Sequence, residues 1–177
     1  MLCGLGLLVT AQAQKVMPEI KAGTILGATA FVNGQEVPVL FTLRRIETPI
    51  TFAWSVDGYG EGEFEINQKA YENGKSIYTE QPPQGTVKLG DSETYGLISK
   101  EAYKSLADTK TFTYNTLKFK AKETGAKPMK FGDKEVDATH VASEDGKVEL
   151  WILNNPSFPL ILQTAGFGID ILINEIK

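Results

Sequence analysis

Polar and apolar residues alternate with a period of two along most of this chain. In residues 61–67, for example, Glu61, Glu63 and Glu65 alternate with small or apolar residues. Successive side chains of a strand point to opposite faces of a sheet, so this pattern predicts a strand with one apolar face. Alternation or runs of β-branched and aromatic residues predict strands at 25–32, 37–45, 50–56, 61–67, 94–98, 111–122, 135–143, 147–153, 160–164 and 167–176.

Turn signals separate these segments. Asn33-Gly34 lies between two apolar runs and predicts a tight hairpin, because both residues tolerate a positive φ. Asp145-Gly146 predicts a second reversal. Pro38 has no amide hydrogen to donate, which predicts that the strand carrying it lies at a sheet edge.

Helical signals are few. Ser99 is a good N-cap residue for a helix over 100–108, and residues 68–74 favour one helical turn. Strands that recur with turns between them, and one or two short helices, predict a mainly β fold. We expect a single antiparallel-sheet domain, either a curled half-barrel or a sandwich, spanning residues 25–177.

The first residues resemble a secretory signal peptide. Residues 1–14 carry no charge, and a short apolar run precedes Ala11-Gln12-Ala13, which has the small residues of a cleavage site. We expect a signal peptide at 1–13, a lead-in at 14–24, and a periplasmic or secreted protein. No later stretch has the length of a transmembrane helix.

Composition excludes several classes of function. The 177 residues include 18 Lys and Arg and 22 Asp and Glu, a net charge of −4 that disfavours nucleic-acid binding. One histidine and one cysteine exclude a His/Cys zinc site and a disulfide. We expect no cofactor and no bound metal.

The motifs of common enzymes are also missing. No serine lies in a Gly-x-Ser-x-Gly context, and His140 is the only imidazole. His140 lies on a predicted strand face with alanines, which favours a buried structural role over acid–base catalysis. We therefore expect a protein that is not an enzyme. The row of glutamates at 61–65 is expected to face water, opposite a lysine row at 118–122.

Two segments carry a resemblance to known proteins. Residues 137–162 place Trp151 on a strand before a proline turn, and Pro159-Leu160 begins the next strand. This segment resembles the closing hairpin of uncharacterised secreted proteins of the Bacteroidetes, as does 89–106 with its Thr94-Tyr95. The strand, Trp, turn and Pro-Leu arrangement is also similar to periplasmic lipoprotein-carrier-type half-barrels. That resemblance implies a curled sheet that encloses an acyl chain.

Three functions remain open. The first is a non-catalytic extracytoplasmic protein that binds an apolar or lipid-like small molecule on a curved sheet, with Trp151, Phe158, Leu160 and Phe119 as wall residues. The second is an envelope structural or protein-interaction domain with a filled core, whose partner would be an envelope protein. The third is a secreted hydrolase that uses a pair of carboxylates.

Overall fold

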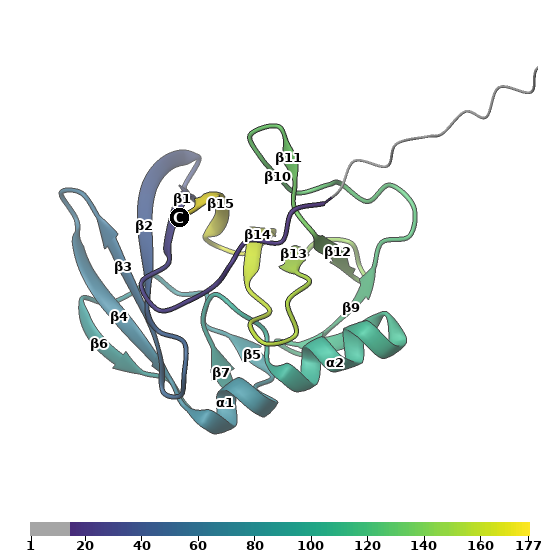
Figure 1. Ribbon diagram of the computed structural model, residues 1–177, viewed down its shortest axis with the longest axis horizontal. Helices are drawn as coiled ribbons and strands as arrows, with labels where there is room; N and C mark the ends of the chain where they lie inside the picture. The colour runs from purple at the N-terminus through teal and green to yellow at the C-terminus, as the bar shows by residue number, and fades with distance from the viewer. Residues whose placement is uncertain (1–14) are drawn as a thin grey trace, which may run out of the picture.

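The computed structural model describes residues 15–177, which form one large, curved and open β-sheet with two short helices at one end (Figure 1). The predicted signal peptide at 1–13 lies outside these residues. From one edge to the other, the eleven strands are β6 (Gly85–Lys88), β4 (Gly60–Ile66), β3 (Ile50–Val56), β2 (Gln35–Arg45), β1 (Ile25–Val32), β15 (Asp170–Ile176), β14 (Ile161–Ala165), β13 (Glu149–Leu153), β12 (Ala138–Ser143), β9 (Leu117–Ala121) and β8 (Thr111–Tyr114).

The sheet confirms the predicted mainly β, antiparallel fold. Every pair of neighbours is antiparallel except β4 and β6, and the two edge strands β6 and β8 do not pair with each other. The chain therefore forms one open sheet and neither a closed barrel nor a two-sheet sandwich. Two small ribbons accompany it, β5 (Ser76–Ile77) with β7 (Glu93–Thr94), and β10 (Lys130–Phe131) with β11 (Lys134–Glu135).

Both predicted helices form. Helix α1 (Gln68–Asn73) begins after Asn67, whose side chain accepts a hydrogen bond from the amide of Ala70. Helix α2 (Lys100–Thr109) begins after Ser99, which caps it in the same way. The two helices lie next to each other (Figure 1), and α2 packs against β8.

The first hairpin forms as predicted, whereas the prediction from Pro38 is wrong for its strand. Asn33 and Gly34 have φ values of 51° and 78°, as a tight hairpin turn requires. Strand β2 lies inside the sheet, between β1 and β3. Its pairing with β3, however, begins only at Leu40. At Pro38 the strand therefore has no β3 neighbour, and no ladder hydrogen bond is lost there.

Three other expectations are corrected. The predicted strand 111–122 is a hairpin of β8 and β9, because Asn115 and Thr116 both adopt a positive φ. The predicted strand 94–98 shortens to the last residue of β7. The glutamates of β4 do not face the lysines of β9. Glu63 instead pairs with Arg44 on β2, since β4 and β9 lie far apart in the strand order.

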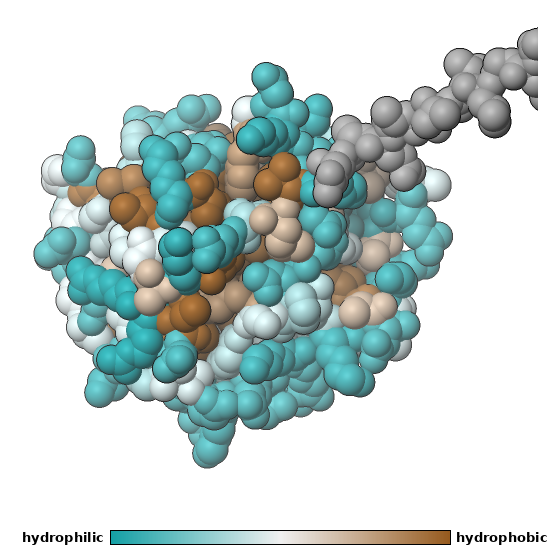
Figure 2. Space-filling view, in the orientation of Figure 1, coloured by the Kyte–Doolittle hydropathy of each residue, from teal (hydrophilic) through white to brown (hydrophobic). Residues whose placement is uncertain are grey.

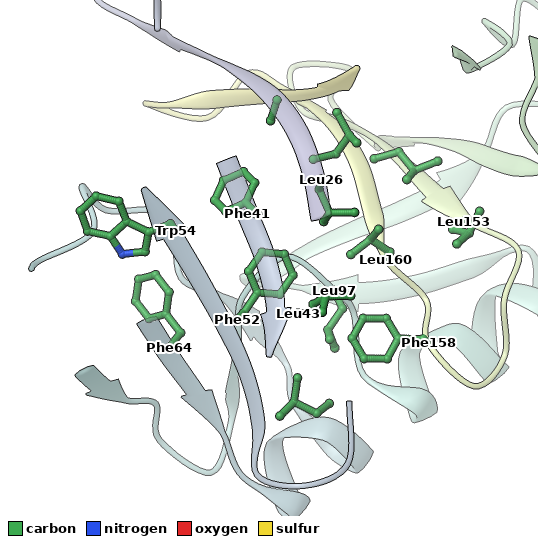
Figure 3. Close-up of a cluster of buried hydrophobic side chains, with 14 of the residues drawn as sticks. Leu26, Phe41, Leu43, Phe52, Trp54, Phe64, Leu97, Leu153, Phe158 and Leu160 are labelled. Carbon is green, nitrogen blue, oxygen red and sulfur yellow. The ribbon is translucent and has the colours of Figure 1, made fainter. Parts of the chain in front are cut away.

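The apolar residues form two buried clusters. The first cluster lies over β1, β2, β3, β4 and β15 and reaches Leu160 of the segment before β14 (Figure 3). The second cluster joins Leu106 of α2 to Phe112 and Phe119 of the β8–β9 hairpin and to Leu150 of β13. Strand β13 contributes to both clusters, because both of its faces are buried.

Candidate functional site

A cavity of about 510 Å³ lies beside the first cluster, over β1, β2, β3 and β15. Four segments at one end of these strands contribute lining residues, and we call them the rim: 33–36, 57–61, 79–84 and 166–170. The rim residues Asn33, Asp57 and Glu80 line the cavity and are exposed, so the cavity opens to solvent at this end. Its aliphatic walls include Val32, Val37, Val39, Ile169, Ile171 and Ile173.

Small side chains in the middle of the sheet leave the space. Ala30 of β1 pairs with Val37 of β2 on one side and with Ile171 of β15 on the other. Ala28, two residues earlier on β1, pairs in the same way with Val39 and Ile173. Because side chains of paired residues stand on the same face of the sheet, two alanines between larger neighbours form a trough. On the face shown in Figure 2, hydrophobic residues gather in the middle of the molecule, framed by hydrophilic ones.

The rings of Phe41, Phe52, Tyr78 and Tyr95 form the floor of the cavity, and Phe64 packs against them without lining it. Tyr95 stacks on Phe64 with ring centroids 4.1 Å apart and meets Phe52 edge to face at 5.4 Å. Phe41 meets Phe52 in the same way at 5.4 Å, and Tyr78 lies 5.0 Å from Phe64. Offset and edge-to-face contacts of this kind stabilise a rigid apolar surface.

Gly96 allows Tyr95 to reach this floor. Its φ is +69°, a conformation that residues with a Cβ rarely adopt. A Cβ at this position would lie 2.7 Å from the ring of Phe52. The chain can therefore turn directly beside Phe52 and place the ring of Tyr95 against it only with glycine here.

Two phenol groups supply polar atoms in this apolar space. Within residues 15–177, the hydroxyls of Tyr78 and Tyr95 make no hydrogen bond, and both residues line the cavity. Burial, with Tyr78 nearby, raises the pKa of Tyr95. Burial, together with Glu80 and Glu93, raises the pKa of Tyr78. Both phenols therefore stay neutral near pH 7, able to donate or accept a hydrogen bond from a ligand.

Hydrogen bonds hold two rim segments together. Gln81 donates a hydrogen bond to the hydroxyl of Tyr59 at 2.6 Å, and Gln84 donates one to the Tyr59 carbonyl at 2.8 Å. The ring of Tyr59 lies 5.9 Å from that of Trp54, which is buried. Gly62 makes room for this indole, since a Cβ there would lie 2.8 Å from Trp54 Nε1. The segment 79–84 is thus fixed beside the β3–β4 turn.

The structure places the four predicted wall residues elsewhere. Trp151, Phe158 and Leu160 are buried in the first cluster, and Phe119 is buried in the second. None of the four lines the cavity. Phe158 and Leu160 lie on the side of the first cluster away from Trp54 (Figure 3). The structure therefore brings three of the predicted residues into one cluster and separates the fourth.

His140 is buried, as predicted, and both of its ring nitrogens form hydrogen bonds. It stacks on Trp151 with centroids 4.0 Å apart. Its Nδ1 accepts a hydrogen bond from the amide of Lys127 at 3.0 Å, so its Nε2–H donates to Glu149 at 3.0 Å. Burial lowers the pKa of His140, although Glu149 opposes this effect. Trp151 donates to the Lys127 carbonyl, so the two rings together hold this loop in place.

Sequence reasoning missed the residues that build the cavity. Phe52 and Trp54 share a face by simple alternation, and that signal was available in the sequence. Tyr78 and Tyr95 lie in a stretch rich in proline and glycine with little periodicity. Only the pairing of β5 with β7 brings them side by side, with their rings 6.5 Å apart.

Among residues 15–177, no group of three or more His, Cys, Asp or Glu side chains is placed to hold a metal ion. No helix in that range has the length and apolar character needed to cross a membrane. Comparisons with protein-family models, with curated proteins and with solved structures found no match.

Proposed function

We propose that this chain is a non-catalytic binding protein that holds an apolar small molecule in the cavity beside β1, β2, β3 and β15. The observation that carries the proposal is the cavity itself, about 510 Å³ and lined mainly by aliphatic and aromatic side chains. Binding sites for small molecules usually have volumes of about 300–1,000 Å³ and apolar walls with a few polar groups. The hydroxyls of Tyr78 and Tyr95 are such polar groups.

The cavity favours this function over an interaction domain with a filled core. Protein interiors are close-packed, and an open apolar cavity of this size costs stability when no ligand fills it. Ala30 of β1, which lines the cavity between Val37 and Ile171, leaves this space unfilled. A domain that only contacts a protein partner does not need such an unfilled space.

We also propose that the protein acts outside the cytoplasm. This part of the proposal rests on the signal-peptide pattern of residues 1–13 and on the resemblance to secreted proteins and periplasmic carriers. N-terminal sequencing of the protein isolated from its host is the direct measurement. An N-terminus at residue 14 in the periplasmic or secreted fraction is expected, and a cytoplasmic protein with an intact N-terminus would contradict it.

A fluorescence binding assay tests the proposed function. The neutral fluorescent probe N-phenyl-1-naphthylamine is expected to bind the purified chain with enhanced emission. Val39→Phe adds a ring inside the cavity wall and is expected to weaken binding about tenfold or more, because overfilled space excludes the probe. Native mass spectrometry of protein purified from its host is expected to show a bound small molecule.

The control variant is Leu40→Phe. Leu40 follows Val39 on β2 but points to the opposite face, where it is 54% exposed. We expect it to bind the probe like the unmodified chain, and circular dichroism checks that both variants fold. Bare protein in the mass spectrum, together with no probe binding, would refute the proposal. Equal binding by both variants would show that the ligand lies elsewhere.

A further inference from the structure

The rim of the cavity carries negative charge only. Its four segments, 33–36, 57–61, 79–84 and 166–170, contain no Lys or Arg, although the whole chain has 18 of them against 22 Asp and Glu. Asp57 and Glu80 line the cavity directly. The rim segments contribute these carboxylates: Glu36, Asp57, Glu61, Glu80 and Asp170.

Basic side chains neutralise acidic groups on the outer face of the sheet but not at the rim. On β4, Glu63 lies 2.7 Å from Arg44, and Glu65 lies 3.6 Å from Lys88. Glu61, on the same strand but at the rim, forms no ion pair within residues 15–177. The same holds there for the other rim carboxylates, Glu36, Asp57, Glu80 and Asp170.

Two neighbours of the rim do not change this balance. Asp170 accepts hydrogen bonds from the amides of Gly166 and Phe167, which are neutral. Lys147 has its backbone carbonyl beside Gly166, but its ammonium group lies 3.7 Å from Asp145. Clefts lined by charge of one sign concentrate ions of the opposite sign, so the opening attracts cations.

The charge reaches into the cavity. Glu93 of β7, two residues before Tyr95, has a raised pKa because it is partly buried and lies near Glu80. Glu80 and Glu93 also act on the phenol of Tyr78, which lines the cavity. An anionic group placed here would meet the same repulsion without any basic partner. A cation would be attracted.

Aromatic rings lie at the same end of the cavity. Tyr59 belongs to the rim, two residues after Asp57 in the chain, and its ring lies 5.9 Å from that of Trp54. The faces of Trp and Tyr rings attract cations, most strongly where water is excluded. Aromatic rings are the usual means by which proteins bind alkylammonium groups, and nearby carboxylates add Coulomb attraction.

From this charge pattern we infer that the ligand of the cavity is an apolar molecule with a positively charged head group, which lies at the rim near Asp57, Glu80 and Tyr59. Its apolar part occupies the space between the Tyr95 floor and the Val39 wall. This inference rests on the proposed function and names the class of ligand. It excludes fatty acids and other anionic amphiphiles as preferred ligands.

The test compares three molecules with one chain length and three charges. Decyltrimethylammonium, decanol and decanoate each displace the neutral probe from the full chain, at low salt and below their micelle concentrations. We expect the cation to bind about tenfold more tightly than the anion, with the alcohol between them. Added salt is expected to reduce the difference, because it screens exposed charges.

Variants assign the preference to the rim. In the double variant Asp57→Asn with Glu80→Gln, the ratio of cation to anion affinity is expected to fall close to one, with decanol binding unchanged. Glu65→Gln, which removes a paired carboxylate on the outer face, is the control and is expected to keep the ratio.

The outcomes are distinguishable. If none of the three molecules binds, the proposed function fails. If decanoate binds as tightly as the cation or more tightly, only the inference on charge fails. A preference for the cation that persists in the double variant would also overturn the assignment to Asp57 and Glu80.

Discussion

The two ends of the sheet differ in what lies over their apolar face. Where β8, β9, β12 and β13 form the sheet, helix α2 closes the second cluster with Ala102 and Leu106. Helix α1 adds Ala70 and Tyr71 to the first cluster, but within residues 15–177 neither helix lines the cavity over β1, β2, β3 and β15. The irregular segment 79–84 borders the cavity there instead.

The comparison shows that alternation produces an apolar face but does not decide how that face is filled. At the α2 end, Phe112 and Phe119 stack with centroids 5.2 Å apart, and large side chains interdigitate. At the cavity end, Ala28 and Ala30 stand where larger residues would fill the space. An amphipathic helix laid over the face gives a filled core, and small residues under a loop give a binding cavity.

Removal of a ring from the filled end is expected to have the largest effect. Phe119 is 1% exposed and stacked, so Phe119→Ala leaves a cavity that the surrounding residues cannot close. We expect the free energy of unfolding, measured by denaturant titration, to fall by about 3–5 kcal/mol.

The folded fraction of Phe119→Ala is expected to bind the neutral probe unchanged, because Phe119 does not line the cavity. A loss of about 1 kcal/mol or less would show that the α2 end is loosely packed. Weaker probe binding by the folded fraction would show that Phe119 contributes to the binding site after all, as the sequence predicted.

Acidification is expected to act on the β12–β13 part of the sheet, through His140, which pairs with Trp151. Its pKa lies below 6.5 in the folded chain, first because it is buried, and protonation of Nδ1 would break its bond from the Lys127 amide. Between that lowered value and 6.5, the unfolded chain binds more protons than the folded one. Stability is therefore present above pH 6.5 and is lost as the pH falls through this window.

The measurement is the free energy of unfolding at pH 7.5 and at steps down to pH 5.5. In His140→Gln this pH dependence is expected to become smaller, because the variant side chain does not titrate. Stability that is constant or rises on acidification in the unmodified chain would contradict the prediction. Loss of neutral-probe binding over this range would show that the two ends are coupled.

The features that the sequence predicted best are turns and helix caps, which short stretches of chain determine. The Asn33-Gly34 turn and the Ser99 cap form as expected, because each depends on residues within a few positions. The turn at Asn115-Thr116 was missed since a β-branched residue rarely adopts a positive φ. Only the tertiary fold reveals that Thr116 does so.

The candidate site was less accessible to sequence reasoning, because distant segments build it. The sequence predicted Trp151 and Phe158 as wall residues of a binding surface, whereas both are buried in the first cluster and neither lines the cavity. Which rings border empty space depends on the small residues opposite them. Ala30 and Gly96 are separated by more than sixty positions, and no periodic pattern connects them.

The smallest effect is expected at the wall of the cavity. Ile171 and Ile173 lie on one face of β15 and both line the cavity, but Ile171 is half-buried near the rim whereas Ile173 is 2% exposed. Ile173→Ala is expected to cost about 2–5 kcal/mol of unfolding free energy, like other buried positions. Ile171→Ala is expected to cost about 1 kcal/mol or less, because its methyl groups already face open space and few contacts are lost.

Denaturant titration of both variants gives the comparison, and the unmodified chain is the reference. Equal losses for the two would mean that Ile171 packs as tightly as Ile173, and that the cavity closes in the absence of a ligand. If saturating neutral probe stabilises the unmodified chain more than Ile171→Ala, then Ile171 contacts the bound molecule.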